Sequence, residues 1–338
     1  MSPWLLLFIF LTVCWNDAEL CGADRHIVVA KDGSGNFTTI GEAIAAAPIQ
    51  SKDIISIMIR EGVYDEYIVI GKEKINIMFI GDGMYKTIVS GNRSVHDGIG
   101  TDKTATVDIL GDGFIAKEMT FQNTAGREKE QAVALKSDAQ SAFYKCRFLG
   151  FQDTLYAKSK RQFYRDCEIH GTVDFIFGDA SAVFQKCLIF ARKPLNGQNI
   201  ITAQGRESPE SKGGIILHNC TIKAAADLIP YKSSTKTYLG RPWKTLYSRV
   251  VVMESYIEDL IDPRGWIEWN KNLTNLDKLF YAEYQNQGPG ANTTNRVKWP
   301  GYKVLKIPSE VSQFTVKNFI KGNEWIPWTG IPFISGLL

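Results

Sequence analysis

Two aspartates stand at the same distance from two cysteines. Asp153 lies seven residues after Cys146, and Asp174 lies seven residues after Cys167. If these segments stack as neighbouring parallel strands, the two aspartates lie roughly 4.8 Å apart along the backbone. Two carboxyl groups at this separation cannot both ionise freely. The pKa of one is therefore raised, unless a nearby cation stabilises the charged form of the other. Such a pair could combine a nucleophile with acid/base catalysis. The alternative is two solvated turn aspartates.

The neighbours of the two aspartates favour the catalytic interpretation. Asp174 lies in the mostly apolar run 171–178, where a solvated turn aspartate is not expected. Gln152 directly precedes Asp153, and Gln131 lies 22 residues before Asp153, about one coil away. Amide donors that face a developing negative oxygen are the parts of an oxyanion hole. Gln131 and Gln152 are therefore candidate oxyanion donors.

The elements that position these residues are predicted by an internal repeat. A pattern of aromatic or aliphatic residue, two residues, Cys, one residue and an apolar residue occurs at 143–148, 184–189 and 217–222, and with one extra residue before Cys at 163–169. A period near 20 residues with strand propensity and no intervening helix predicts a parallel β-helix. The alternative, an antiparallel β-sandwich, would need hairpin turns that are scarce in the middle of the chain. One helix is predicted, at Ile40–Ala47, because an alanine-rich run ends at Pro48.

The cysteines of the repeat would lie in one column. Cysteines in equal phase on adjacent coils come near the Cα separation of a disulfide, about 5.5 Å. We expect the pairs Cys146–Cys167 and Cys187–Cys220, with Cys167–Cys187 as the alternative. The absence of Cys-x-x-Cys spacing argues against a zinc site, and no metal or other cofactor is expected.

The N-terminus predicts secretion. Trp4 to Trp15 is a mostly apolar run of 12 residues, shorter than the roughly 20 needed to span a bilayer. We interpret residues 1–23 as a signal peptide and residues 24–338 as one domain; the alternative for the run is a buried strand or an anchor. Glycosylation sequons begin at Asn36, Asn92, Asn272 and Asn292, and a less favourable one at Asn219.

Composition limits the partners. The chain has 338 residues, 44% hydrophobic and 22% charged, with a formal net charge of +3. That mild basicity is compatible with an acidic polymer as substrate. It is far from the signature of a nucleic-acid-binding protein. We therefore expect a soluble protein with no nucleic-acid or membrane partner.

Several motifs together resemble one family. They are Gln131–Leu135, Gln152–Leu155, Gly171–Gly178 and Leu239–Trp243, in this order, with further matching segments at 28–35, 62–66 and 314–336. This set is similar to the plant pectin methylesterases (pectinesterases) nearly from end to end. The resemblance implies an all-β, right-handed parallel β-helix and hydrolysis of galacturonosyl methyl esters with release of methanol. It also implies that the chain is a form without the N-terminal inhibitor-like pro-region of many relatives.

The resemblance assigns roles to individual residues. Asp174 would be the nucleophile and Asp153 the general acid, then the general base. Gln131 and Gln152 would stabilise the oxyanion, and Arg241 would hold Asp174 ionised. The residues implied to contact the sugar are Arg241, Trp243, Phe175, Tyr156 and Trp266. Trp269 is expected to be a packing residue.

The resemblance also implies a biological setting and leaves alternatives. We expect a secreted monomer that acts on methyl-esterified pectin in the cell wall, with a proteinaceous pectinesterase inhibitor as a further partner. One alternative is a glycosidase that uses the same aspartates to cleave the polymer. Another is a non-catalytic wall-binding solenoid. A serine esterase is not favoured because no Gly-x-Ser-x-Gly motif is present.

Overall fold

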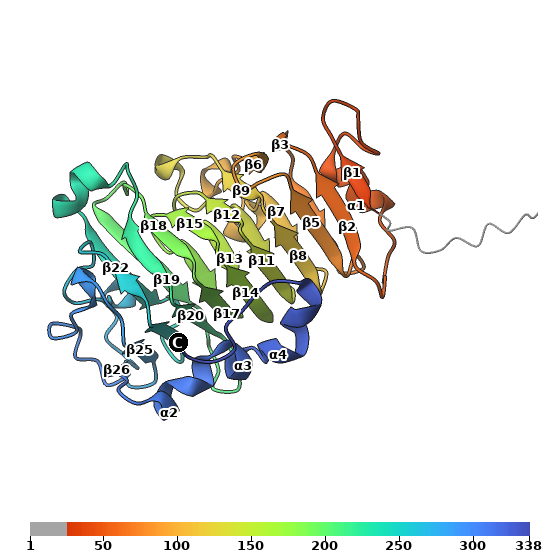
Figure 1. Ribbon diagram of the computed structural model, residues 1–338. Helices are drawn as coiled ribbons and strands as arrows, with labels where there is room; N and C mark the ends of the chain where they lie inside the picture. Colours follow the sequence, from red (N-terminus) through yellow and green to blue (C-terminus); the bar gives the residue numbers. More distant parts are fainter. Residues whose placement is uncertain (1–25) are drawn as a thin grey trace, which may run out of the picture.

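The computed structural model describes residues 26–338 and shows three parallel sheets wound around one core (Figure 1). Successive coils contribute a strand to each sheet, and every strand pairing within this range is parallel. The predicted parallel β-helix is therefore confirmed. The predicted signal peptide, residues 1–23, lies outside the described residues.

In each sheet, strands from successive coils pair with one another in chain order. The eleven-stranded sheet contains β1 (Ile27–Val29), β2 (Ile55–Ile59), β5 (Ile77–Gly81), β8 (Phe114–Lys117), β11 (Ser141–Tyr144), β14 (Arg161–Arg165), β17 (Ser181–Gln185), β20 (Gly214–His218), β23 (Arg249–Met253), β25 (Phe280–Tyr284) and β26 (Tyr302–Val304). The seven-stranded sheet contains β4 (Ile68–Ile70), β7 (Val107–Ile109), β10 (Leu135–Ser137), β13 (Leu155–Ala157), β16 (Ile176–Gly178), β19 (Gln198–Gln204) and β22 (Lys236–Pro242). The eight-stranded sheet contains β3 (Gly62–Asp65), β6 (Thr87–Gly91), β9 (Thr120–Asn123), β12 (Arg147–Leu149), β15 (Glu168–Gly171), β18 (Leu188–Ala191), β21 (Thr221–Ala224) and β24 (Tyr256–Ile257).

The helices of the described chain are short. The α-helices are α1 (Ile40–Ala46), α2 (Pro308–Val311), α3 (Val316–Phe319) and α4 (Gly322–Trp325). The 3-10 helices are η1 (Val95–Asp97), η2 (Thr101–Lys103), η3 (Arg127–Lys129), η4 (Ile229–Ser234), η5 (Trp269–Lys271), η6 (Pro289–Ala291), η7 (Ser312–Phe314) and η8 (Ile326–Thr329). Helix α1 confirms the predicted helix. It begins after Thr39, whose hydroxyl oxygen accepts a hydrogen bond from the backbone N–H of Glu42.

The core is built from side chains that repeat from coil to coil. Phe143, Tyr164 and Phe184 occupy paired positions on β11, β14 and β17, and all three are fully buried. Their rings stack, with centroids 4.8 Å and 4.3 Å apart. Because strands pair in register, inward-pointing residues of equal phase form columns, and burial of these columns is the main driving force for folding.

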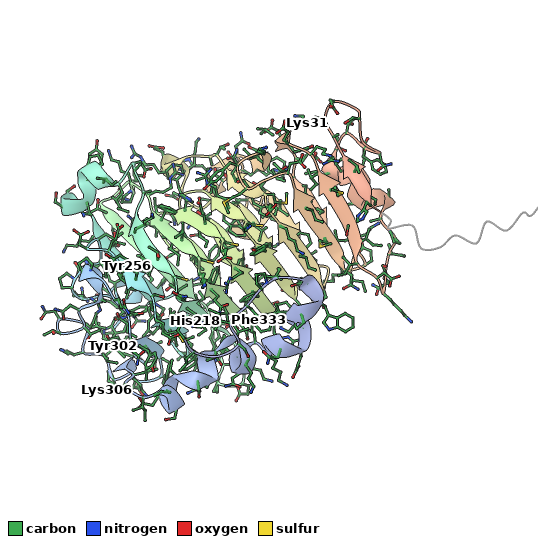
Figure 2. All side chains as sticks on the ribbon, viewed as in Figure 1. Lys31, His218, Tyr256, Tyr302, Lys306 and Phe333 are labelled. Atoms are coloured by element: carbon green, nitrogen blue, oxygen red, sulfur yellow. The ribbon has the colours of Figure 1, made fainter. Side chains whose placement is uncertain are left out.

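The C-terminal segment covers the outer face of the eleven-stranded sheet (Figure 1). Its apolar side chains pack against outward-pointing residues of that sheet, including the edge-on contact between Phe163 and Phe333. Gln185 of β17 accepts a hydrogen bond from the backbone N–H of Ile334 and donates one to its carbonyl, at 2.8 and 2.9 Å. His218 and Phe333 mark this crossing in Figure 2. One face of the solenoid is thus sealed, while the seven-stranded sheet carries open surface.

Across residues 26–338, none of the helices has the length and apolar character needed to cross a bilayer. The same range holds no group of three or more His, Cys, Asp or Glu side chains arranged to bind a metal ion.

Candidate active site

Asp153 and Asp174 lie opposite each other on consecutive coils. Strands β13 and β16 pair with Leu155 beside Ile176, so the residues two positions upstream, Asp153 and Asp174, are also paired. The backbone N–H of Asp153 donates to the carbonyl of Val173 at 3.0 Å. Both aspartates have positive φ, 60° and 52°, a left-handed conformation that aspartate adopts more readily than most residues. The placement predicted from the cysteine spacing is confirmed.

Arg241 binds Asp174 through two nitrogens on one edge of its guanidinium. Nε donates to Oδ1 at 2.8 Å and Nη2 donates to Oδ2 at 2.6 Å. Arg241 lies on β22, two strands along the sheet from β16, in the column formed with Ala203 and Phe177. A bidentate, charge-assisted pair of this kind fixes both the charge and the plane of the carboxylate. The expected contact of Arg241 with Asp174 is present.

The two carboxyl groups have different electrostatic environments. Asp153 is 8% exposed and Asp174 is 5% exposed. Burial raises the pKa of Asp153 well above its usual range, the charge of Asp174 raises it further, and Arg241 partly opposes both. Burial also raises the pKa of Asp174, but the Arg241 hydrogen bonds and charge counteract it. The pair therefore favours a proton on Asp153 and a negative charge on Asp174.

Gln131 and Gln152 lie beside the aspartates. Their backbones form an isolated parallel bridge between neighbouring coils. Both side chains line the cleft that contains Asp153 and Asp174. Within residues 26–338, neither side-chain amide is hydrogen-bonded to another protein group, so both can donate to a ligand.

The cleft has a volume of about 400 Å³ and an aromatic wall. Tyr156 and Phe177 stack with ring centroids 4.3 Å apart, and Trp243 meets both rings edge-on. Trp269 lines the cleft as well. The site therefore combines a carboxylate paired with arginine, a buried carboxyl group whose pKa is raised, free amide donors and flat apolar surfaces of the kind that stack on sugar rings.

A family model described as Pectinesterase matches residues 26–323. The chain belongs to the pectinesterase family. Pectinesterase 2 of Citrus sinensis is 56% identical over 313 residues, which cover 92% of this chain and 61% of that protein. The chain thus spans about three fifths of the length of the curated relatives it matches. Several of those relatives have names that combine pectinesterase with pectinesterase inhibitor.

Solved pectin methylesterases share the fold. The enzyme from carrot superposes with a TM-score of 0.90 at 51% identity, covering 92% of this chain and 98% of that one. A pectin methylesterase solved in complex with a hexasaccharide is 26% identical, with a TM-score of 0.73, and covers 87% of this chain and 96% of that one.

Two of the aromatic residues expected to contact the sugar do not reach the pectinesterase cleft. Phe175 is fully buried in the core. Trp266 is also fully buried, and its indole Nε1 donates to Glu283 at 3.2 Å. Their places in the cleft are taken by Phe177 and Trp269. The expectations for Phe175, Trp266 and Trp269 were therefore wrong, whereas Tyr156, Trp243 and Arg241 do line the cleft.

A signal for Phe177 was present in the sequence. Tyr156 lies three residues after Asp153, and Phe177 lies three residues after Asp174, so the spacing that aligned the aspartates also aligns these two rings. Phe175 points into the core together with Ile176, whereas Asp174 and Phe177 line the cleft. For Trp269 no comparable repeat exists, because it lies in a long loop outside the strands.

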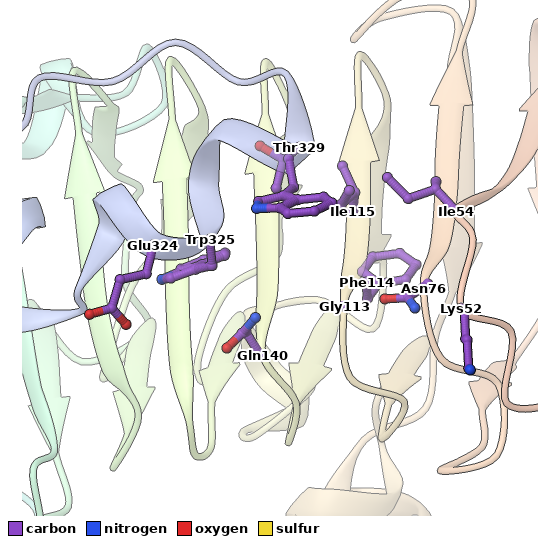
Figure 3. A pocket seen from close by; sticks show the side chains of 11 residues that line it. Lys52, Ile54, Asn76, Gly113, Phe114, Ile115, Gln140, Glu324, Trp325 and Thr329 are labelled. Atoms are coloured by element: carbon purple, nitrogen blue, oxygen red, sulfur yellow. The ribbon is translucent and has the colours of Figure 1, made fainter.

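A second cavity of about 250 Å³ adjoins the cleft and shares Gln131 and Gln152 with it. Arg127, Asn196 and Leu195 lie on its far side. Another groove, of about 230 Å³, lies between the C-terminal segment and the eleven-stranded sheet, and its lining includes Trp325 of the segment and Ile115 of the sheet (Figure 3). None of the residues that line this groove lines the cleft. The open space next to the aspartates therefore continues past the glutamines and not toward the C-terminal segment.

The predicted disulfides are not formed. Cys146, Cys167, Cys187 and Cys220 are all buried free thiols. The Sγ of Cys167 donates to the carbonyl of Phe143 on the preceding coil, and the other three cysteines repeat this contact. Side chains in register on parallel strands point the same way, so their Cβ atoms stay near the strand spacing of about 4.8 Å, whereas a disulfide needs about 3.8 Å. The Cα spacing alone did not reveal this.

The predicted glycosylation sites lie at the surface. Asn36, Asn92 and Asn292 are exposed, and Asn272 is partly exposed. Their modification stays a prediction.

Proposed function

We propose that this protein hydrolyses methyl esters of galacturonosyl residues in pectin, releasing methanol and leaving acidic pectin. The observation that carries the proposal is the Arg241 fork on Asp174, with the buried Asp153 in register beside it. Membership in the pectinesterase family supports this substrate. The hexasaccharide complex of a relative and the aromatic wall of the cleft favour a polymeric ligand.

In the first half of the proposed reaction, Asp174 is the nucleophile. Its carboxylate oxygen bonds to the ester carbonyl carbon, and the electron pair of the C=O bond moves to the carbonyl oxygen. Amide N–H groups of Gln131 and Gln152 stabilise that oxyanion. Asp153 gives its proton to the methoxy oxygen as the carbon–oxygen bond breaks, so methanol leaves and an acyl-enzyme anhydride remains.

In the second half, Asp153 reverses its role. Now ionised, it takes a proton from a water molecule whose oxygen attacks the galacturonosyl carbonyl carbon. The bond to Asp174 breaks, and its carboxylate returns to the fork of Arg241. One water is consumed and one methanol is released in each cycle. Asp153 ends protonated, as it began, and the new carboxylic acid of the sugar ionises in solvent.

We further propose that the protein acts outside the cell, in the wall where pectin is found. Secretion through residues 1–23, a single catalytic domain at 24–338 and a monomeric state belong to this proposal. Binding of a proteinaceous pectinesterase inhibitor is a further part of it, and the combined names of several relatives support that partner.

The test compares wild type with Asp174→Asn on highly methylated pectin. We expect wild type to release methanol without new reducing ends. Asp174→Asn should lose methanol release by about 10³-fold or more, because removing a nucleophile costs orders of magnitude. Asp259→Asn is the control, since Asp259 is exposed, pairs with Lys232, and neither residue lines the cleft.

The other outcomes identify the alternatives. New reducing ends without methanol would show a glycosidase that uses the same aspartates. Pectin binding with neither product would show a non-catalytic wall-binding protein. Equal methanol release by wild type and Asp174→Asn would contradict the assignment of the nucleophile while leaving the esterase activity in place.

A further inference from the structure

Trp269 covers the flat face of the Arg241 guanidinium. The Cζ atom of Arg241 lies 4.1 Å from the centroid of the Trp269 ring. Contacts within about 6 Å of a tryptophan ring are attractive for a cation, and more so away from water. The Arg241 side chain is 16% exposed, and its donor edge is already committed to Asp174. The guanidinium is thus held by a carboxylate at its edge and an indole on its face.

The position of Trp269 is determined by a loop that runs along β22. The backbone N–H of Leu239 donates to the carbonyl of Gly265 at 2.7 Å, and that of Ile267 donates to the carbonyl of Gly240 at 3.1 Å. The loop therefore continues the parallel ladder beside the strand that carries Arg241. Trp269 follows two residues after this pairing, at the start of η5.

Buried contacts fix the loop to the core. Trp266 is fully buried and donates to Glu283, and Arg296 donates to the carbonyl of Pro263 at 3.2 Å. An ion pair between Arg264 and Glu268, 2.8 Å long, closes the loop just before Trp269. The indole is therefore placed by anchored backbone on both sides of the ladder contact and does not depend on a ligand.

We infer that Trp269 is a positioning residue that keeps the Arg241 guanidinium in the plane from which it engages both oxygens of Asp174. Arginine has a long side chain with several rotatable bonds, and stacking on a fixed ring removes that freedom before substrate arrives. The indole also keeps water from one face of the ion pair, which strengthens the attraction between the charges. The inference rests on the proposed function, since it concerns the ionisation of the proposed nucleophile.

The charged surroundings of Asp174 define the direction of the effect. Asp153 faces it from the turn before β13, Arg241 binds it from β22, and the buried phenol of Tyr281 on β25 is near enough for the charge of Asp174 to raise the pKa of the phenol. Arg241 is the cation that opposes the rise in the pKa of Asp174 caused by burial. A looser Arg241 leaves that rise unopposed, so the pKa of Asp174 increases and a higher pH is needed to ionise the nucleophile.

The experiment measures pH profiles of methanol release for wild type, Trp269→Ala and Trp269→Phe. For Trp269→Ala we expect kcat to fall about 10-fold and the acidic limb of kcat/KM to move up by about half a pH unit, the size expected from losing one cation–π contact. Trp269→Phe keeps a ring on Arg241 and should restore the acidic limb. Trp243→Ala is the comparison, because Trp243 lines the same cleft without stacking on Arg241; it should raise KM and leave the limb in place.

A second readout does not depend on activity. The titration of the Asp174 carboxyl group can be followed by ¹³C NMR of aspartate-labelled protein, assigned with Asp174→Asn. An upward shift of its midpoint in Trp269→Ala supports the inference even if wild type releases no methanol, which would overturn only the proposed function. A rise in KM with an unmoved acidic limb and an unmoved midpoint would show that Trp269 only contacts substrate, and would overturn the inference.

Discussion

Asp153 is a carboxyl group placed where its charged form is strongly disfavoured. Asp153 is buried and lies in register with Asp174. The guanidinium of Arg241 binds Asp174 and not Asp153. Burial and the Asp174 charge raise the pKa of Asp153 well above its usual range. The raised pKa is what a proton donor to a leaving alcohol needs near neutral pH. The same burial makes Asp153 a source of instability at neutral pH.

Asp153→Asn should therefore lose activity and gain stability. Methanol release should fall by about 100-fold or more, because a general acid contributes 10²–10⁴-fold. Folding raises the pKa of this carboxyl group, so the folded state is favoured most when the group is protonated in both states, below its unfolded pKa of about 3.9. That contribution to the stability of the fold is lost as the pH rises through the folded-state pKa. The variant should unfold at a higher Tm than wild type at pH 7, with the difference disappearing near pH 3.5.

Thermal unfolding at several pH values checks this sign. A Tm difference that is constant with pH would show that Asp153 is not protonated on folding. A variant that keeps wild-type methanol release would show that another group supplies the proton.

At the scale of the element, four consecutive coils share a turn that carries a buried cysteine. The four thiols pack as small apolar side chains in the core that contains the aromatic column, and each donates to a carbonyl of the preceding coil. Free cysteine packs in this way as well as an aliphatic residue of similar size. The turns are thus held by packing and do not need covalent links.

Peptide mapping can test the state of these thiols. When the protein is unfolded and alkylated without reductant, we expect Cys146, Cys167, Cys187 and Cys220 all to carry the alkyl group. Before unfolding they should not react, because all are fully or almost fully buried. A cross-linked peptide containing Cys146 and Cys167, or Cys187 and Cys220, would contradict the free-thiol structure.

The turn also shows how far sequence reasoning extends. The positions of Asp153, Asp174 and both glutamines follow from spacing, because a parallel ladder converts equal phase into spatial neighbours. Arg241 lies 67 residues after Asp174 and has no phase relation to it in the sequence, so only the resemblance to a family suggested the contact. Side-chain direction was the weak step. The direction of the side chain determines that Phe177 and not Phe175 lines the cleft, and that the cysteines stay free thiols. A Cα spacing contains no information on that direction.

At the scale of the whole molecule, one buried ion pair joins the last coils. Glu283 of β25 accepts hydrogen bonds from Arg296 at 2.8 and 3.2 Å, from the Trp266 indole and from the Tyr302 hydroxyl. The side chains of Glu283 and Arg296 are 3% and 2% exposed. Through these contacts β25, β26 and the loop that carries Trp269 form one unit.

Glu283→Gln should destabilise the fold because it leaves Arg296 buried without a counter-charge. We expect a loss of about 3 kcal/mol or more in the free energy of unfolding, measured by urea titration. The matched change Asp259→Asn breaks a pair whose side chains are 57% and 36% exposed, and should change stability by less than about 0.5 kcal/mol. Equal effects of the two changes would show that Glu283 does not hold the terminal coils together.

The pairing of β13 with β16 has a consequence for how such a protein can evolve. The separation of Asp153 and Asp174 is set by backbone hydrogen bonds between consecutive coils and not by the loops that connect them. Loops on the outer corners can therefore lengthen, shorten or change sequence over generations without disturbing the pair. A single-residue insertion between Cys167 and Asp174 would break the register and turn the carboxylate away from its neighbour. Changes in the connecting loops thus leave the two aspartates in register, whereas a change of length within this turn does not.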